Sequence, residues 1–174
     1  VGASFVVINV NNPQNATLQE TNAFIGDNVE IGLASNGEVG NVLVEAKPDI
    51  TLDAQTFGLA GGIGAASVNF AEANLENEAS ATIGNSDIAA TGTVTVRTLA
   101  KGSGKVTGTG VAAGGVGAGA MIADLDRGGD DLADSPAPNP DNEVSAGIKS
   151  GAKIMADRLV ILANSDDMMD VRST

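Results

Sequence analysis

The 174-residue chain contains no cysteine, histidine, tryptophan or tyrosine, and only four phenylalanines. Without cysteine it can form no disulfide and offers no thiol nucleophile. Without histidine it lacks the commonest general base and a usual zinc ligand. Paired carboxylates could cleave a glycosidic bond, but sugar-cleaving sites usually add aromatic platforms. We therefore expect that the chain is not an enzyme, and a polysaccharide lyase or hydrolase is the third of three alternatives.

Positive charge is also scarce, since nine Lys and Arg residues face 22 Asp and Glu residues, for a net charge of −13. Such a surface does not neutralise nucleic-acid phosphates and is not attracted to anionic lipids. No apolar run reaches the ~20 residues that a membrane-spanning helix needs. We expect no nucleic-acid partner and no membrane insertion.

What the chain does contain is repetition. The motif Ala-Gly-Gly-Ile-Gly-Ala at residues 60–65 returns as Ala-Gly-Gly-Val-Gly-Ala at 113–118, and Val-Gly-Ala at 1–3 matches its tail. An Ala-x-Ile segment, a pair of turn-forming residues and an apolar strand follow in each copy. The Ala-x-Ile segments are residues 23–25, 81–83 and 146–148, and the strands are 42–46, 94–98 and 159–163. Repeats of this kind are stable only when they stack on one another.

The periodicity within a copy is two. In residues 92–98, Val94 and Val96 share one face while Thr95 and Arg97 share the other, which indicates a half-buried strand. Crossover connections between parallel strands of one sheet are nearly always right-handed. We therefore predict an all-β, right-handed parallel β-helix (β-solenoid) with about three repeats of about three coils each. Residues 148–156 have a mild helical rhythm, so a short helix is the alternative there.

We expect one domain over residues 1–174. Its repeats span approximately 1–60, 61–113 and 114–174, and an acidic, proline-rich loop is inserted at 127–142. Both ends fall inside the repeat pattern, so we expect a fragment of a longer array or a filament subunit. Residues 159–162 are apolar on both faces, which predicts that an insert or another subunit covers this strand. Open end strands would also pair with a neighbour.

The acidic insert is the best candidate ligand site. Asp124, Asp126, Asp130 and Asp131 surround a Gly-Gly pair that permits a sharp turn, and calcium takes six to eight oxygens from such loops. The match to an EF-type loop is poor, because Ser135 stands where a closing Glu is needed. The alternative is a solvated acidic loop, and we give the same interpretation to Asp166, Asp167 and Asp170. Calcium is the one cofactor expected, and no catalytic residue is expected.

Residues 81–96, of the form Ala-x-Ile-Gly-Asn-Ser-Asp-Ile-x-Ala-x-Gly-x-Val-x-Val, follow Gly-Ala-x-Ser-Val-Asn at 64–69. These segments resemble the repeats of large bacterial exoproteins, the filamentous-haemagglutinin-like and autotransporter-like adhesins. The resemblance implies a secreted or cell-surface β-solenoid with a role in adhesion, biofilm or filament building. We expect an extracellular structural or adhesive rod segment whose partners are itself, stacked end to end, or neighbouring repeats of its parent chain. Host or cell-surface glycans or proteins are further expected partners. A calcium- or glycan-binding module acting through the insert is the second alternative.

Overall fold

A computed structural model describes residues 2–10, 20–33, 37–75, 78–113, 116–127 and 143–173. The regular structure of these residues is entirely β, which confirms the all-β prediction. The described strands are β1 (Gly2–Val10), β2 (Glu20–Ile25), β3 (Glu30–Ile31), β4 (Val42–Ala46), β5 (Asp49–Gly61), β6 (Gly64–Leu75), β7 (Glu78–Ile83), β8 (Asp87–Ala89), β9 (Thr93–Ala113), β10 (Val116–Arg127), β11 (Val144–Ile148), β12 (Lys153–Met155) and β13 (Arg158–Ser173). The alternative of a helix at 148–156 is wrong, because β11, a turn and β12 occupy this stretch.

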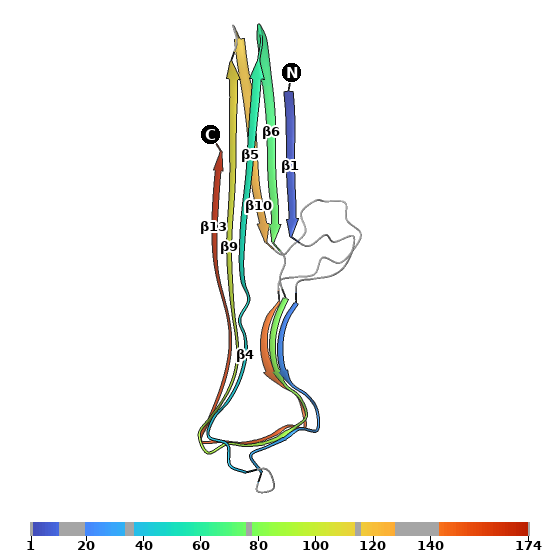
Figure 1. Cartoon of the computed structure of the whole chain (residues 1–174), viewed down its shortest axis with the longest axis vertical. Coiled ribbons are helices and arrows are strands. Elements are labelled where there is room, and N and C mark those ends of the chain that lie inside the picture. The colour runs from blue at the N-terminus through green and yellow to red at the C-terminus, as the bar shows by residue number, and fades with distance from the viewer. Residues whose placement is uncertain are drawn as a thin grey trace.

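The strands form four parallel sheets, and each sheet takes its members from the three copies in turn. The orders are β1-β6-β10, β2-β7-β11 and β3-β8-β12, and in the fourth sheet β9 lies between β13 and the successive strands β4 and β5. The strand of the second copy is central in every sheet, so each copy forms one layer of a three-layer stack (Figure 1). The prediction of about three coils within each copy is wrong, because every strand pairing in the described residues joins two different copies.

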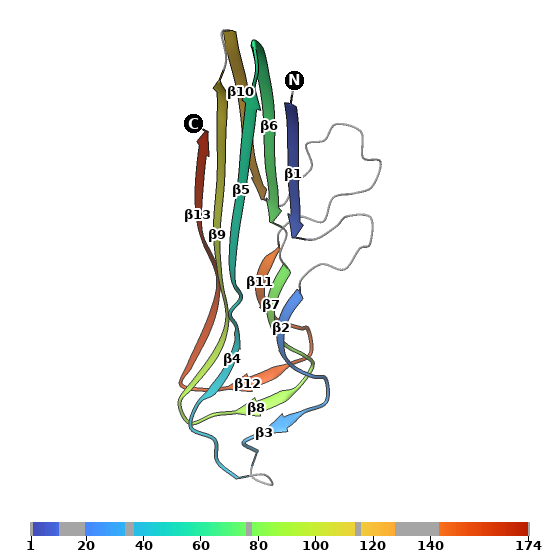
Figure 2. The same cartoon turned by 45° about the horizontal axis from the view of Figure 1, so that its top comes forward.

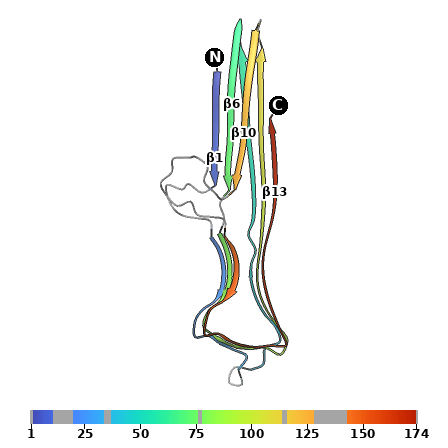
Figure 3. The same cartoon turned by 180° about the vertical axis from the view of Figure 1, so that it is seen from behind.

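Each layer follows the same path. The chain descends through one long strand, crosses the lower end through a short strand and rises again on the other side (Figures 1 and 2). The long strands β1, β6 and β10 face β5, β9 and β13 in the upper part, which we call the upper blade (Figure 3). The lower region comprises residues 20–33, 37–46, 78–100 and 143–163, where three sheets surround an interior. The two regions share the same layers but differ in cross-section.

Branched apolar side chains fill the lower region. Ile83, Ile88, Val94 and Val96 of the second layer are at most 1% exposed and belong to one cluster. Their partners in the first and third layers lie directly beside them, as Ile25 and Ile148 do for Ile83. Alternation within each strand puts these residues on the inner side, so the parallel register turns each inward position into an axial stack.

Small residues fill the upper blade instead. Ala54, Ala71 and Val106 are fully buried and form a second cluster with Leu52. Since Ala71 belongs to β6 and the others to β5 and β9, this cluster joins the two facing sheets. The inward positions of β9 include the buried glycines 102, 104 and 108. Short or absent side chains allow the facing backbones to approach closely.

The repeat alignment predicts which residues of the three copies lie side by side. This prediction is confirmed for the Ala-x-Ile segments and the apolar strands. Ala81 pairs with Ala23 and Ala146, and Val94 pairs with Val42 and Leu159, as the repeat alignment predicts. The prediction is wrong for the glycine-rich segment, where the motif match sets the glycines at 2, 64 and 117 side by side. Gly64 pairs instead with Val116, and Gly2 pairs with Ser67. Small residues specify register weakly, whereas Phe70, further along β6, pairs with Phe5 and Ile122.

The turns of the lower region stack as closely as its strands do. The backbone N–H of Asn85 donates to Asp27 Oδ1 at 2.7 Å. The buried Ser86 hydroxyl donates to the Gly26 carbonyl at 2.6 Å. A Cβ at Gly84 would lie 2.8 Å from the carbonyl carbon and oxygen of Gly26. Glycine is therefore required at this position by the close approach of the neighbouring layer.

Candidate functional site

The outer face of the fourth sheet carries charges that alternate in sign from layer to layer. In the register of this sheet, Lys101 of β9 lies between Asp49 of β5 and Asp166 of β13. Four residues further along, the same order recurs with lysine again in the middle strand. We call the resulting set the charge ladder: Asp49, Lys101 and Asp166, followed by Asp53, Lys105 and Asp170.

Strand alternation explains why the ladder faces outward. On β5 the outward positions Asp49, Thr51 and Asp53 are exposed, while the intervening positions point into the blade, where Leu52 is buried. On β9 both lysines are exposed and the two glycines between them, 102 and 104, are buried. Opposite charges on neighbouring strands attract one another, while like charges side by side are destabilising. The middle strand therefore neutralises acidic neighbours on both of its sides.

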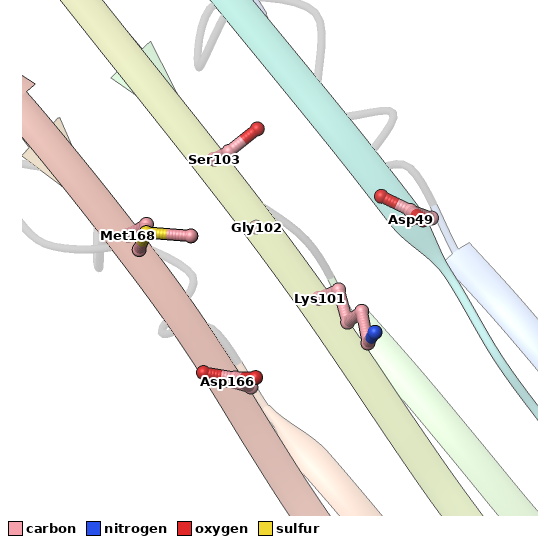
Figure 4. Close-up of a pocket in the computed structure, with 6 residues that line it drawn as sticks. All are labelled: Asp49, Lys101, Gly102, Ser103, Asp166 and Met168. Atoms are coloured by element: carbon pink, nitrogen blue, oxygen red, sulfur yellow. The ribbon is translucent and has the colours of Figure 1, made fainter.

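A hollow of about 150 Å³ lies within this ladder (Figure 4). Its lining comes from three adjacent strands: Asp49 from β5, then Lys101, Gly102 and Ser103 from β9, and Asp166 and Met168 from β13. The Ser103 hydroxyl donates to Thr51 Oγ1 at 3.2 Å, so a polar contact continues across the same face. Among the lining residues, Lys101 lies between the acidic residues Asp49 and Asp166. Such an arrangement favours a basic strand beside an acidic one.

Ion pairs flank the ladder at both ends. The Arg97 guanidinium of β9 binds the Glu45 carboxylate of β4. Arg97 lies four residues before Lys101 on the same strand. On β13, Arg172 Nε donates to Asp170 Oδ1 at 2.9 Å. The hydrogen bond that Arg172 donates to this carboxylate and the negative charge of the carboxylate both raise the pKa of Arg172. Arg172 thus offsets part of the charge of Asp170.

Strand β13 also presents apolar side chains. Leu159 and Ile161 are 47% and 48% exposed, although their partners Val94 and Val96 in the middle layer are fully buried. The neighbouring Leu162 is 45% exposed. The apolar residues on both faces of 159–162 predict a cover over this strand, and in the described part of the chain none lies on it. The cover therefore stays a prediction.

The predicted calcium site is only partly described. Asp124 and Asp126 occupy alternate positions of β10, with Glu72 and Asn74 of β6 as their Cα partners. Asp130 and Asp131 lie outside the described residues, as does the insert from 128 to 142. In the part of the chain that the structure describes, no three carboxylates gather closely enough to hold a metal ion. Calcium binding through the insert stays a prediction, which isothermal titration with calcium chloride would test.

The second acidic cluster divides between two faces of β13. Asp166 and Asp170 join the charge ladder, whereas Asp167 takes the alternate position opposite the buried Gly102. The Ser165 hydroxyl donates to Asp167 Oδ2 at 2.7 Å. The sequence pattern favours a solvated face for all three, and the ladder was not predicted. The signal was present, because the repeat alignment already sets an acidic, a basic and an acidic residue at matched positions.

No protein-family model, no curated protein and no solved structure matches this chain. The resemblance to filamentous-haemagglutinin-like and autotransporter-like adhesins therefore stays a prediction. In the described ranges there is also no helix long and apolar enough to cross a membrane.

Proposed function

We propose that the chain is an extracellular structural or adhesive segment of a rod built as a right-handed parallel β-helix. One observation carries the proposal: the second copy is central in all four sheets. A chain that lays each repeat on the previous one adds length in one direction with every copy. The right hand is expected from the strong preference of parallel crossovers.

The mechanical properties of such a rod follow from its contacts. Parallel strands lie about 4.8 Å apart, so each layer adds about that length and one set of backbone hydrogen bonds in every sheet. Inside, each layer adds another member to the stacks formed by residues such as Ile83 and Val94. The net charge of −13 keeps such strand-rich particles apart in solution. Stiffness along the axis and solubility are the two properties that a surface rod needs.

Adhesion requires side chains that face away from the interior. Several large apolar residues do so, among them Phe24, Phe57, Leu59 and Ile63, which is 95% exposed. Phe57, Leu59 and Ile63 belong to the upper end of the blade, around the link between β5 and β6. Exposed apolar groups of this kind favour contacts with a partner surface. In the proposed function the partner is a host or cell-surface glycan or protein.

Antibody labelling of the cells that produce the protein tests this proposal. The expected result is labelling of intact cells that is lost after brief treatment with an external protease. A cytoplasmic protein of the same cells, which should be labelled only after permeabilisation, is the control. Labelling of this chain only after permeabilisation would contradict an extracellular role.

A further inference from the structure

The outer edge of β13 is a pairing surface with a defined chemistry. In the described residues β13 pairs with β9 alone, so the backbone groups on its other edge face outward over a strand of 16 residues. Leu159 and Ile161 continue two interior stacks that end there half-exposed. A further parallel strand would satisfy the backbone edge and bury these side chains. The open question is which sequence such a strand carries.

A second copy of this chain is the first occupant to consider, because its β4 and β5 would continue the sheet. In the register that the layers already use, Asp49 and Asp53 of the second copy would lie beside Asp166 and Asp170. Ile50 would lie beside Asp167 and cover a carboxylate with an apolar side chain. Like charges side by side and a carboxylate under an apolar group are both unfavourable. The identical copy is therefore a poor match at three positions.

The strand that already lies against β13 shows what fits. Strand β9 places Lys101 beside Asp166, Gly102 beside Asp167 and Lys105 beside Asp170. Gly102 has no side chain, which leaves space for water at the carboxylate of Asp167. The two lysines lie beside the two outward carboxylates and attract them. The same strand also fits Asp49, Ile50 and Asp53 of β5 on its other side. A sequence of the form Lys-Gly-x-x-Lys thus suits an acidic strand on either edge.

We propose that the outer edge of β13 accepts a parallel strand with basic residues opposite Asp166 and Asp170 and a small residue opposite Asp167, in preference to a second copy of this chain. The proposal rests on the layered rod described above and names the strand chemistry that extends it. The apolar stacks at Leu159 and Ile161 supply affinity for any strand with branched inward residues, and the charges determine which strand is preferred. Acidic and basic layers would then alternate along the rod.

An added fourth layer tests the proposal in the full chain. The chain is extended beyond Thr174 by a copy of residues 110–113, which completes the rising strand, and then by a copy of residues 62–113. The added layer carries its own copies of the two lysines opposite Asp166 and Asp170. The matched control is the same extended protein with Lys101→Asp and Lys105→Asp made only in the added copy. Amide hydrogen exchange of residues 159–171 is measured in both proteins and in the original chain.

The expected result is at least tenfold slower exchange of alternate β13 amides with the lysine-bearing layer than with the aspartate-bearing layer. The difference should shrink in 1 M NaCl, because exposed charges are screened. Equal protection by both layers would overturn the charge selection and leave the layered rod standing. No protection by either layer would overturn both the selection and the rod.

Sedimentation of the original chain tests the exclusion of a second copy. We expect the original chain to stay monomeric in low salt, and the Asp166→Lys/Asp170→Lys variant to associate, because its lysines would meet Asp49 and Asp53 of the next copy. The same lysines lie beside Lys101 and Lys105 within the chain, so circular dichroism first checks that the variant keeps its β structure. Glu38→Lys/Glu143→Lys makes the same change in net charge at exposed positions outside the ladder and should remain monomeric. End-to-end association of the original chain as strong as that of the ladder variant would overturn the proposal.

Discussion

The lower region and the upper blade are formed by the same three layers, yet their interiors differ in kind. In the lower region, isoleucine and valine fill a space enclosed by three sheets. In the blade, alanine and glycine line two sheets that face one another, with Val106 and Leu52 as the larger members. The size of the inward side chains therefore determines how far apart the walls of one continuous layer stand.

This difference predicts opposite sensitivities. An interior of branched side chains loses most when a side chain is shortened, because a cavity remains in place of many contacts. An interior of alanine and glycine has little to lose by shortening and is sensitive to added volume. The following substitutions test this contrast between the two regions.

The largest effect is expected for Ile83→Ala in the lower region. Ile83 is fully buried and stacked between Ile25 and Ile148, so the change should lower the free energy of unfolding by about 2–5 kcal/mol. Urea unfolding followed by circular dichroism measures it. Ile63→Ala, at a 95% exposed isoleucine, is the control and should change stability by less than about 0.5 kcal/mol. Equal effects of the two substitutions would break the contrast.

In the upper blade, Ala71→Leu should be the damaging change. Ala71 is fully buried between the facing sheets, and the added volume should cost about 1–3 kcal/mol of stability. Thermal unfolding of this variant is compared with that of Ala120→Leu, at an exposed position of β10. A neutral Ala71→Leu would mean that the two sheets of the blade are free to separate.

Gly84→Ala tests whether the turns of the lower region stack closely, and it should lower the stability of the protein. The new Cβ would lie 2.8 Å from the Gly26 backbone, so the turn must shift, at about 1–2 kcal/mol. Gly26→Ala places the same methyl group one layer away, with no atom within 4 Å, and should be nearly neutral. Denaturation midpoints of the two variants decide this, and an equal loss in both would point to backbone entropy as the cause.

The smallest effect is expected at the Arg97–Glu45 ion pair on the outer face. Its side chains are 38% and 27% exposed, so a double-mutant cycle with alanine should give a coupling of about 0.2–1 kcal/mol. The coupling should nearly vanish in 1 M NaCl. A coupling that persists in high salt would show that the two alkyl chains, and not the charges, hold these side chains together.

The sequence predicts the fold where its side chains are distinctive. Ala81, Ile83 and Val94 find their predicted partners because a shift by one residue would turn apolar residues outward. The glycine-rich motif leads to a wrong register, since its small residues are nearly interchangeable. The charge ladder could also have been found from the alignment, but only if charged positions are compared between copies.

The number of coils could not be predicted for a related reason. The prediction divides each copy at about 20 residues per coil, because its strands are expected to be short and to end at turn-forming residues. Glycines 102, 104 and 108 are residues of this kind. In the structure these glycines are buried within the 21-residue strand β9 and face the opposite sheet. Local sequence alone does not distinguish a glycine that ends a strand from one that admits a neighbouring backbone.

Disulfide trapping tests the central claim, that the second copy lies between the first and the third. The chain has no cysteine, so cysteine pairs can be introduced at Leu43, Thr95 and Val160, which are partners across β4, β9 and β13. Neighbouring strands lie about 4.8 Å apart, within the range of a disulfide, whereas the outer pair is about twice as far apart and beyond it. Mass spectrometry after mild oxidation of the dilute protein should find the bridge for Leu43→Cys/Thr95→Cys and for Thr95→Cys/Val160→Cys, and not for Leu43→Cys/Val160→Cys. An intramolecular bridge in the last variant, or none in the first two, would contradict the layered arrangement.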